Sequence, residues 1–190
     1  MKTEEAKRRF RLGMGCMLLM TILLLSAKED HFQKLINHQQ DPRIAMELEY
    51  FRQSGIERAV SLEEYDPEKV IAEVQRYTGT PAHMGGTSFK GIDCSGLVMM
   101  AHRSCGICLP HSAEEQARYG AVVPFQENLQ RGDLIFFYDS YSSSKFITHS
   151  GIYLGEGKFI HTSSSKGVMV SELQEKYWQK RFLFGTRFAD

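Results

Sequence analysis

The sequence lacks an excess of charge of either sign, because 23 Lys and Arg residues balance 23 Asp and Glu residues among 190. A nucleic-acid-binding protein needs a basic surplus to neutralise phosphates, so this balance argues against that function. Cysteine is also scarce, and four cysteines in a chain of this length do not make a disulfide scaffold. The hydrophobic share of 42% is enough for one ordinary core, so composition predicts one globular domain with a short extra segment.

Long hydrophobic runs are missing as well, with one short exception near the start of the chain. Residues 12–27 carry no charge, follow the basic residues Arg8, Arg9 and Arg11, and are followed at once by Lys28. As a helix this run would span about 24 Å, which is short against a bilayer core of about 30 Å. A basic start, an apolar middle and small residues at the end are typical of a secretory signal. A cleaved signal, an uncleaved anchor and a buried helix all remain open.

The first two interpretations both send the rest of the chain across a membrane. The basic flank precedes the apolar run, so the N-terminus would stay inside. We therefore expect residues 1–27 to be a signal peptide or an N-terminal membrane anchor, and to be the only part that contacts a membrane. The remainder would be exported from the cytoplasm to the periplasm, the cell envelope or the medium.

Residues 28–65 combine many polar side chains with apolar ones at helical spacing, which predicts a helical spacer or packing arm. Asp41 followed by Pro42 is typical of a helix start within this segment. Asp66 followed by Pro67 is a second helix start, at the beginning of the globular part, residues 66–190.

The apolar spacing changes from helical to alternating after about residue 130. Helices are expected to begin at Asp66, Asp93 and Ser112. Strands are expected at 133–138, 148–154, 158–162, 168–170 and 182–188. Helices followed by an antiparallel sheet are the α+β order.

Cys94 is the first candidate for chemistry. Asp93 precedes an apolar helical stretch and is a good N-cap, which would place Cys94 in the first turn. The free N–H groups and partial positive charge of a helix N-terminus stabilise a thiolate, so we expect a lowered pKa for this thiol. A lone cysteine is more often a small buried residue, and the position alone leaves both roles open.

Two histidines are predicted to meet on one face of the sheet. If residues 155–157 form a hairpin loop that pairs Leu154 with Lys158, alternation places His149 and His161 on the same face. They would be diagonal neighbours on adjacent strands, within reach of each other's side chains. A single strand histidine is more often structural, but two on one face favour a functional pair.

Nucleophilic acyl transfer needs a nucleophile, a base and a group that orients the base. Cys94, His149 and His161 supply these three groups, and Gly151, opposite His161, leaves space beside them. An imidazole in place of a carboxylate would orient the base mainly by hydrogen bonding. This chemistry requires no metal and no cofactor, and we expect neither.

Cys105-Gly106-Ile107-Cys108 is a second cysteine motif, and His102 and His111 lie near it. Ordinary structural cysteines, a disulfide in an oxidising compartment and a zinc site all fit this spacing. No second ligand pair at zinc-finger spacing is present, which disfavours the metal site.

Five sequence blocks follow one another along the globular part. They are GGTSFKGIDCSGLV (85–98), LPHSAEEQA (109–117), RGDLIFF (131–137), THSGIYLGEGKFIHTSS (148–164) and YWQKRFLFGTRF (177–188). In this order they resemble the NlpC family of papain-like bacterial peptidases of peptidoglycan. The resemblance covers residues 66–190 and implies a papain-like α+β fold, in which N-terminal helices carrying the nucleophile pack on a C-terminal antiparallel sheet.

The resemblance also implies roles for individual residues. Cys94 matches the nucleophile, His149 the base and His161 the third, polar member. The expected substrate-binding residues are Asp93, Ser95, Ser150 and Gly151. The implied reaction is hydrolysis of a peptidoglycan stem-peptide amide, between γ-D-glutamate and a diamino acid, through a thioester. We expect a monomer whose partners are peptidoglycan stem peptides.

One stretch departs from the family pattern. Ala82 stands at the position of a tyrosine whose hydroxyl lies near the catalytic sulfur, and Met84 replaces a tryptophan. Two other functions therefore stay open: a non-catalytic peptidoglycan-binding module, and an amidase or acyltransferase that uses the same three residues on another substrate.

Overall fold

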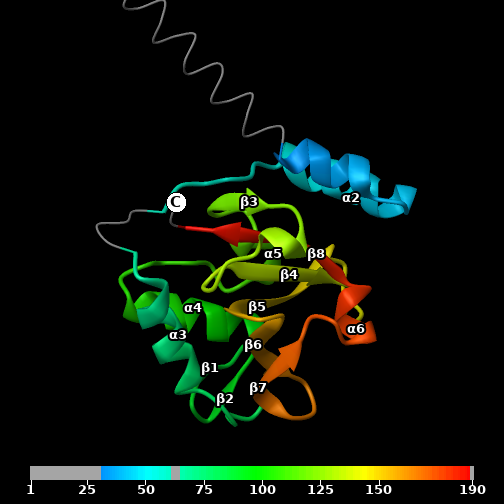
Figure 1. Cartoon of the computed structure of the whole chain (residues 1–190). Coiled ribbons are helices and arrows are strands. Elements are labelled where there is room, and N and C mark those ends of the chain that lie inside the picture. The colour runs from blue at the N-terminus through cyan, green and yellow to red at the C-terminus, as the bar shows by residue number, and fades with distance from the viewer. Residues whose placement is uncertain (1–30, 61–64, 189–190) are drawn as a thin grey trace, which may run out of the picture.

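The computed structural model describes residues 31–60 and 65–188, and the signal or anchor expected at residues 1–27 lies outside this part. Its centre is a six-stranded antiparallel sheet in the order β3-β8-β4-β5-β6-β7 (Figure 1). The strands are β3 (Ala121–Val123), β4 (Leu134–Tyr138), β5 (Ile147–Gly155), β6 (Lys158–Ser163), β7 (Gly167–Glu172) and β8 (Phe182–Arg187). Among the described residues, no helix has the length and apolar character that crossing a membrane requires.

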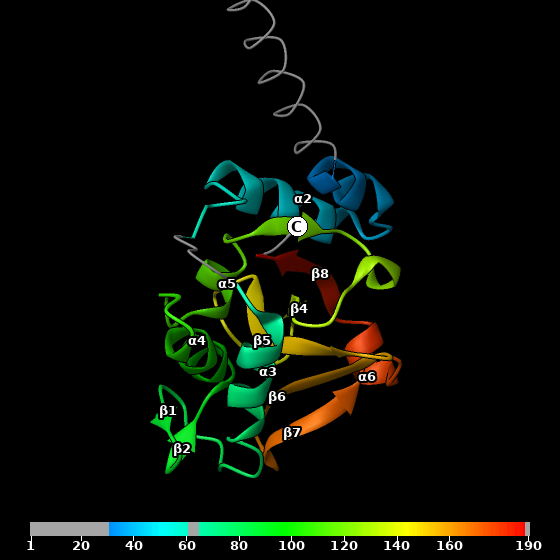
Figure 2. The ribbon, with the colours of Figure 1, turned by 60° about the vertical axis from the view of Figure 1, so that its left-hand side comes forward.

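Helices surround this sheet, and Figure 2 shows α3 and α4 on one side of it and α6 on the other. The helices are α2 (Pro42–Gln53), α3 (Pro67–Gln75), α4 (Cys94–Ser104), α5 (Ala113–Gln116) and α6 (Lys176–Gln179), with a 3₁₀ turn η1 (Gln126–Asn128). Two-residue strands β1 (Thr87–Ser88) and β2 (Gly91–Ile92) pair just before α4. The predicted α+β arrangement of helices followed by an antiparallel sheet is confirmed.

The predicted helix starts are confirmed by their capping bonds. The Asp66 carboxylate accepts a hydrogen bond from the Glu68 N–H, and the Asp93 carboxylate accepts one from the Gly96 N–H. The Asp41 side chain caps α2 in the same way. Such a cap satisfies an N–H group that has no partner within the helix, which is why local sequence predicts the start.

The hairpin between β5 and β6 corrects one predicted pairing. Ile152 pairs with Ile160 as expected, but Lys158 pairs with Gly155, so the predicted pair with Leu154 is wrong. A register shift lies between Tyr153 and Gly155, and the extra residue is absorbed at the loop. The pairs nearer the site keep their faces, because the shift affects only the loop end.

The sheet has two different faces. We call the side packed against α3 and α4 the helix-covered face; its strand residues include Phe136, Ile152 and Ile160. We call the other side the aromatic face. It holds a smaller cluster of six buried residues: Ile135, Phe137, Tyr153, Phe159, Leu173 and Trp178. Strand alternation sends neighbouring residues of one strand to opposite faces, which produces this division.

Residues 31–60 pack into the same core as the rest of the molecule. Residues 31–38 are helical, and Phe32 from this helix lies against Phe184 of β8 with ring centroids 5.6 Å apart. Phe51 of α2 lies 6.0 Å from the same ring, and both phenylalanines from this segment are buried. The segment expected to be a spacer or packing arm therefore covers the part of the sheet that contains β8.

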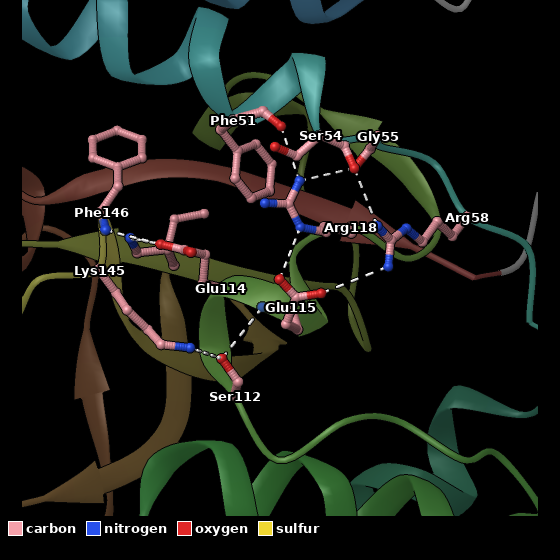
Figure 3. Close-up of polar contacts among 11 residues, drawn as sticks. Phe51, Ser54, Gly55, Arg58, Ser112, Glu114, Glu115, Arg118, Lys145 and Phe146 are labelled. Carbon is pink, nitrogen blue, oxygen red and sulfur yellow. Dashed lines mark hydrogen bonds and ion pairs between the residues drawn. The ribbon is translucent and has the colours of Figure 1, made fainter.

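Arg118, just after α5, joins this arm to the rest of the molecule (Figure 3). Its guanidinium donates to the carbonyl oxygens of Phe51 and Gly55 at 2.9 and 3.0 Å and to the Glu115 carboxylate at 3.1 Å. It also lies 4.1 Å from the centre of the Phe51 ring. Arg118 is buried, so removing its side chain would break both bonds to the arm, at about 0.5–1.5 kcal/mol each.

Candidate active site

One cavity of about 700 Å³ brings the predicted nucleophile and the two predicted histidines together. Cys94, His149 and His161 all line it. Cys94 comes from the first turn of α4, and the histidines come from β5 and β6, which α4 contacts. Asp93 and Ser95, expected to bind substrate, line the same cavity.

Asp93 organises the backbone around Cys94. One carboxylate oxygen accepts from the Gly96 N–H at 2.7 Å and lies 2.9 Å from Nε2 of His111. The other oxygen accepts from the Gly85 N–H at 2.7 Å. Asp93 therefore holds the β1–β2 segment, the start of α4 and His111 in one arrangement. The pairing of His111 with Asp93 was missed, because it joins residues from different elements.

The pKa of the Cys94 thiol differs from the expectation. Burial raises it to about 11, while backbone hydrogen bonds from Ser150 and Ser95 lower it and the charge of Asp93 raises it. The predicted position at a helix N-terminus is confirmed, but the predicted lowering of the pKa is wrong. The reason is that desolvation of the thiolate and the charge of the neighbouring Asp93 carboxylate outweigh the pKa-lowering effect of the helix N-terminus. A raised pKa favours the neutral thiol over the thiolate at neutral pH.

The two histidines form a buried hydrogen-bonded chain. Nε2 of His149 lies 3.0 Å from Nδ1 of His161, and Nε2 of His161 lies 3.0 Å from the hydroxyl oxygen of Ser171. All three residues are buried. The predicted meeting of the two imidazoles on one face is confirmed. Ser171 was missed, because the strand expected at 168–170 ends one residue before it, whereas β7 extends to Glu172.

Burial holds both imidazoles in the neutral form. It lowers the pKa of His149 well below 6.5, and the neighbouring His161 lowers it further. Burial also lowers the pKa of His161 to about 4, against a smaller raising effect of the Thr162 backbone. A neutral imidazole keeps a lone pair on one nitrogen, which is the form that accepts a proton.

Gln116 of α5 fixes the start of α4 against β5. Its side-chain amide donates to the carbonyl oxygen of Ser95 at 2.8 Å, and its amide oxygen accepts from the Ser150 hydroxyl at 3.2 Å. Gln116 and Ser150 are both completely buried. The Ser150 side chain therefore serves this internal bond, which differs from the predicted contact with substrate.

Gly151 also lies away from the cavity lining. A Cβ atom at this position would stand 2.8 Å from the carbonyl oxygen of Ile160 and 3.3 Å from Cβ of His161. The predicted open space beside His161 is wrong, because residues of β6 occupy it. Gly151 therefore serves close packing of the two strands, which differs from the predicted substrate contact.

Trp178 of α6 covers the histidines from the aromatic face. Its ring centroid lies 5.1 Å from that of His149 and 4.7 Å from that of His161. Phe137 and Phe159 pack against the same indole ring. This aromatic wall excludes water from the imidazoles and explains their lowered pKa values.

Cys105 and Cys108 of the second cysteine motif are both free thiols. Within residues 31–60 and 65–188, no group of three or more His, Cys, Asp or Glu side chains is arranged to hold a metal ion. The cavity described above brings together Cys94, His149 and His161, the residues predicted to be nucleophile, base and orienting group.

Comparison with protein families gives a match over most of the globular part. The model of the NlpC/P60 family matches residues 79–187. The gamma-DL-glutamyl hydrolase of Bacillus subtilis is 41% identical over 121 residues, which cover 63% of this chain and 29% of that protein. The murein DD-endopeptidase MepS/murein LD-carboxypeptidase of Escherichia coli K12 is 37% identical over 115 residues, which cover 60% of this chain and 58% of that protein. The chain thus matches less than two thirds of the length of either relative.

Solved structures give the same picture of the fold. An NlpC/P60 family protein from Bacillus cereus matches with a TM-score of 0.60 and 29% identity, over 66% of this chain and 41% of that one. The NlpC/p60 domain of the peptidoglycan hydrolase SagA matches with a TM-score of 0.55 and 26% identity, over 65% of this chain and 99% of that one. Both similarities agree with the α+β fold described above.

Proposed function

The chain belongs to the NlpC/P60 family, and we propose that it is a cysteine endopeptidase that hydrolyses amide bonds in peptidoglycan stem peptides. The observation that carries this proposal is one cavity lined by a cysteine at a helix start and by two hydrogen-bonded histidines. The bond we propose joins γ-D-glutamate to a diamino acid, and the relative named a gamma-DL-glutamyl hydrolase supports this choice.

Cys94 is the proposed nucleophile and His149 the proposed base. As Sγ of Cys94 attacks the amide carbonyl carbon, the thiol proton passes to Nδ1 of His149. The imidazolium then gives that proton to the leaving amine, and the C–N bond breaks to leave a thioester. Water attacks the thioester with His149 as base, which releases the carboxylic acid and restores the thiol.

His161 and Ser171 are the proposed groups that set the tautomer of the base. Nε2 of His149 faces His161, so this nitrogen must carry the hydrogen if Nδ1 is to accept the thiol proton. His161 then accepts at Nδ1 and donates from Nε2 to the Ser171 hydroxyl. This single tautomer satisfies both contacts and leaves Nδ1 of His149 free to act.

Because the resting thiol and imidazole are both neutral, we propose that the thiolate forms only during attack. The imidazolium produced in that step is buried beside aromatic rings. Because burial disfavours the charged form, the imidazolium readily gives its proton to the leaving amine. Backbone N–H groups at the start of α4, including that of Cys94, face the developing oxyanion in this proposal.

We further propose that this reaction takes place outside the cytoplasm, in the cell envelope, on the part of the chain that follows residues 1–27. Peptidoglycan is the proposed partner and the chain is proposed to act as a monomer. Asp93 and Ser95, which line the cavity, are the proposed substrate contacts among the residues singled out in the sequence.

The proposal is tested by digesting defined muropeptides with residues 28–190 and identifying the products by mass spectrometry. The panel contains a disaccharide tetrapeptide with diaminopimelate and a cross-linked dimer, because one relative is named a DD-endopeptidase. We expect two fragments separated at the γ-D-glutamyl–diaminopimelate bond. Cleavage of the cross-link alone would assign a different bond, and sugar release with intact stem peptides would assign an amidase.

Two cysteine variants complete this experiment. Cys94→Ser should give no product while keeping the circular dichroism spectrum of the parent. Cys108→Ser is the matched control, because its thiol is free and exposed outside the cavity, and it should cleave at the parental rate. Binding of muropeptides by the parent without any product would instead indicate a non-catalytic binding module.

A further inference from the structure

The loop of residues 139–146, between β4 and β5, reaches the active-site cavity near its start, and none of its residues takes part in the proton transfers proposed above. Ser140 and Tyr141 from this loop line the cavity together with Cys94. The loop contains the short serine-rich stretch SYSSSK.

Three hydrogen bonds hold the start of the loop. The Arg181 guanidinium donates to the carbonyl oxygen of Asp139 at 2.7 Å, and the Tyr177 hydroxyl donates to the carbonyl oxygen of Ser140 at 3.0 Å. The Ser140 N–H donates to the Thr148 hydroxyl at 3.0 Å. Asp139 adopts a left-handed backbone with φ of 49°, which turns the chain sharply at this point. Tyr141 therefore follows a residue whose backbone is fixed.

The end of the loop is held by α5 and its capping residue (Figure 3). The Glu114 carboxylate accepts from the N–H of Phe146 at 2.8 Å, and the Lys145 ammonium donates to the Ser112 hydroxyl at 3.0 Å. Glu114 accepts from the Ile147 N–H as well. With both ends held, the loop keeps its place against the cavity without a bound ligand.

Tyr141 brings a phenol hydroxyl to this wall. Two tyrosines line the cavity, and the hydroxyl of Tyr177 is already engaged by Ser140. Burial raises the pKa of Tyr141, and the charges of Cys94 and Asp93 raise it further, which agrees with a position near both groups. Ala82, which also lines the cavity, offers no hydrogen-bonding side chain.

We propose that Tyr141 is a further catalytic residue, whose hydroxyl donates a hydrogen bond to the carbonyl oxygen of the scissile amide as negative charge develops on it. The inference rests on the proposed endopeptidase function. The phenol keeps its proton throughout, because its raised pKa disfavours the phenolate. It supplies a donor from the loop, in addition to the N–H groups at the start of α4 in the same cavity.

The test compares Tyr141→Phe, which removes only the hydroxyl, with Tyr50→Phe, which makes the same change on the exposed face of α2. The substrate is the disaccharide tetrapeptide with diaminopimelate, and kcat and KM are measured separately. Loss of one oxyanion donor costs about 10²–10³-fold in kcat. Since Tyr141 is 45% exposed and water can partly replace it, we expect about a tenfold to hundredfold loss.

The outcomes separate the inference from the function on which it rests. A fall in kcat for Tyr141→Phe, with KM changed by less than about twofold and Tyr50→Phe unchanged, supports the inference. Parental kcat in Tyr141→Phe, or a change in KM alone, overturns it and leaves the endopeptidase function standing. A parent that releases no product overturns both.

A second variant tests the role of the hydroxyl without removing the loop residue. Ala82→Tyr adds a phenol at another position in the lining of the same cavity. In the Tyr141→Phe background we expect it to restore kcat at least about threefold, because one donor then replaces the other. An equally large gain in the parent would show that the donor position is vacant there, and would overturn the inference.

Discussion

The two faces of the central sheet differ in composition and in what they contribute to the site. The helix-covered face is largely aliphatic and lies under α3 and α4. The first turn of α4 brings Cys94 to the cavity. The aromatic face is a smaller cluster around Trp178, and it carries His149 and His161. The proposed nucleophile and the proposed base therefore come from opposite sides of one sheet and meet at the cavity.

Burial alone does not distinguish a functional histidine in this molecule. His102 of α4, on the helix-covered side, is completely buried, and burial lowers its pKa to about 4, as it does for His161. Nδ1 of His102 donates to the carbonyl oxygen of Val98 at 2.8 Å, and its ring packs near Tyr65 and Phe188. What separates the two kinds of histidine is access to the cavity, which His102 lacks.

The largest expected effect follows from replacing a histidine on each side. His149→Ala should lower kcat by about 10²–10⁴-fold, the usual contribution of a general base, and leave a folded protein. His102→Ala should leave kcat within about twofold and lower the free energy of unfolding by about 1–3 kcal/mol. Steady-state kinetics and urea unfolding measure the two effects. Equal losses of kcat in both variants would contradict the division between the faces.

The second prediction removes the cover of the aromatic face. Trp178→Ala should lower the free energy of unfolding by about 3–5 kcal/mol, because Trp178 is only 8% exposed and packs among other rings. Water would then reach His149 and raise its pKa toward 6.5, so the acid limb of kcat/KM should move to higher pH.

Trp178→Phe is the control, since it keeps an aromatic ring over the histidines. Its acid limb should stay closer to that of the parent. An acid limb unchanged in Trp178→Ala would show that the aromatic cover does not set the pKa of the base.

The third prediction concerns stability in acid. The lowered pKa values of His102, His149 and His161 mean that the unfolded chain binds more protons than the folded one below pH 6.5. The free energy of unfolding should therefore fall as the pH is lowered from about 6.5 to about 4. His161→Asn removes one of these titrating groups, so its urea midpoint should fall less steeply over this range. A parent stability that is constant across the window would contradict the burial of these groups.

The smallest effect is expected one residue before His161 on the same strand. Ile160→Val changes a side chain of the helix-covered face and should lower the free energy of unfolding by about 0.5–1.5 kcal/mol. The neighbouring imidazole points to the other face, so kcat should be unchanged. Chemical denaturation and steady-state kinetics on one preparation measure both, and a large loss of kcat would show that the faces are coupled.

Much of this division was predictable from local sequence. Caps at Asp66 and Asp93 were predictable because a capping bond joins residues two or three positions apart. The meeting of His149 and His161 followed from strand alternation, which needs only the approximate place of one hairpin. This prediction holds although the pairing of Lys158 was predicted one residue away from its true partner, because Ile152 and Ile160 pair as expected.

The rest depends on contacts between distant parts of the chain. Ser171, Gln116 and Tyr141 reach the site from three different elements, and no local pattern marks them. The short strand β3 pairs with β8, although β4, β5, β6 and β7 all lie between these two strands in the sequence. The raised pKa of Cys94 also depends on distant contacts, because desolvation is caused by all the groups that pack around the thiol.

The packing of residues 31–60 has a mechanical consequence. This segment contacts the sheet at Phe184 of β8, and in the strand order β8 is separated from β5 by β4. A pulling force applied to the chain at residue 31 would first load the aromatic contacts of Phe32 and Phe51 and the bonds of Arg118. Tension on that side would be resisted at β8, which β4 separates from the strand of His149, so we expect the site to hold its geometry while the protein is under load.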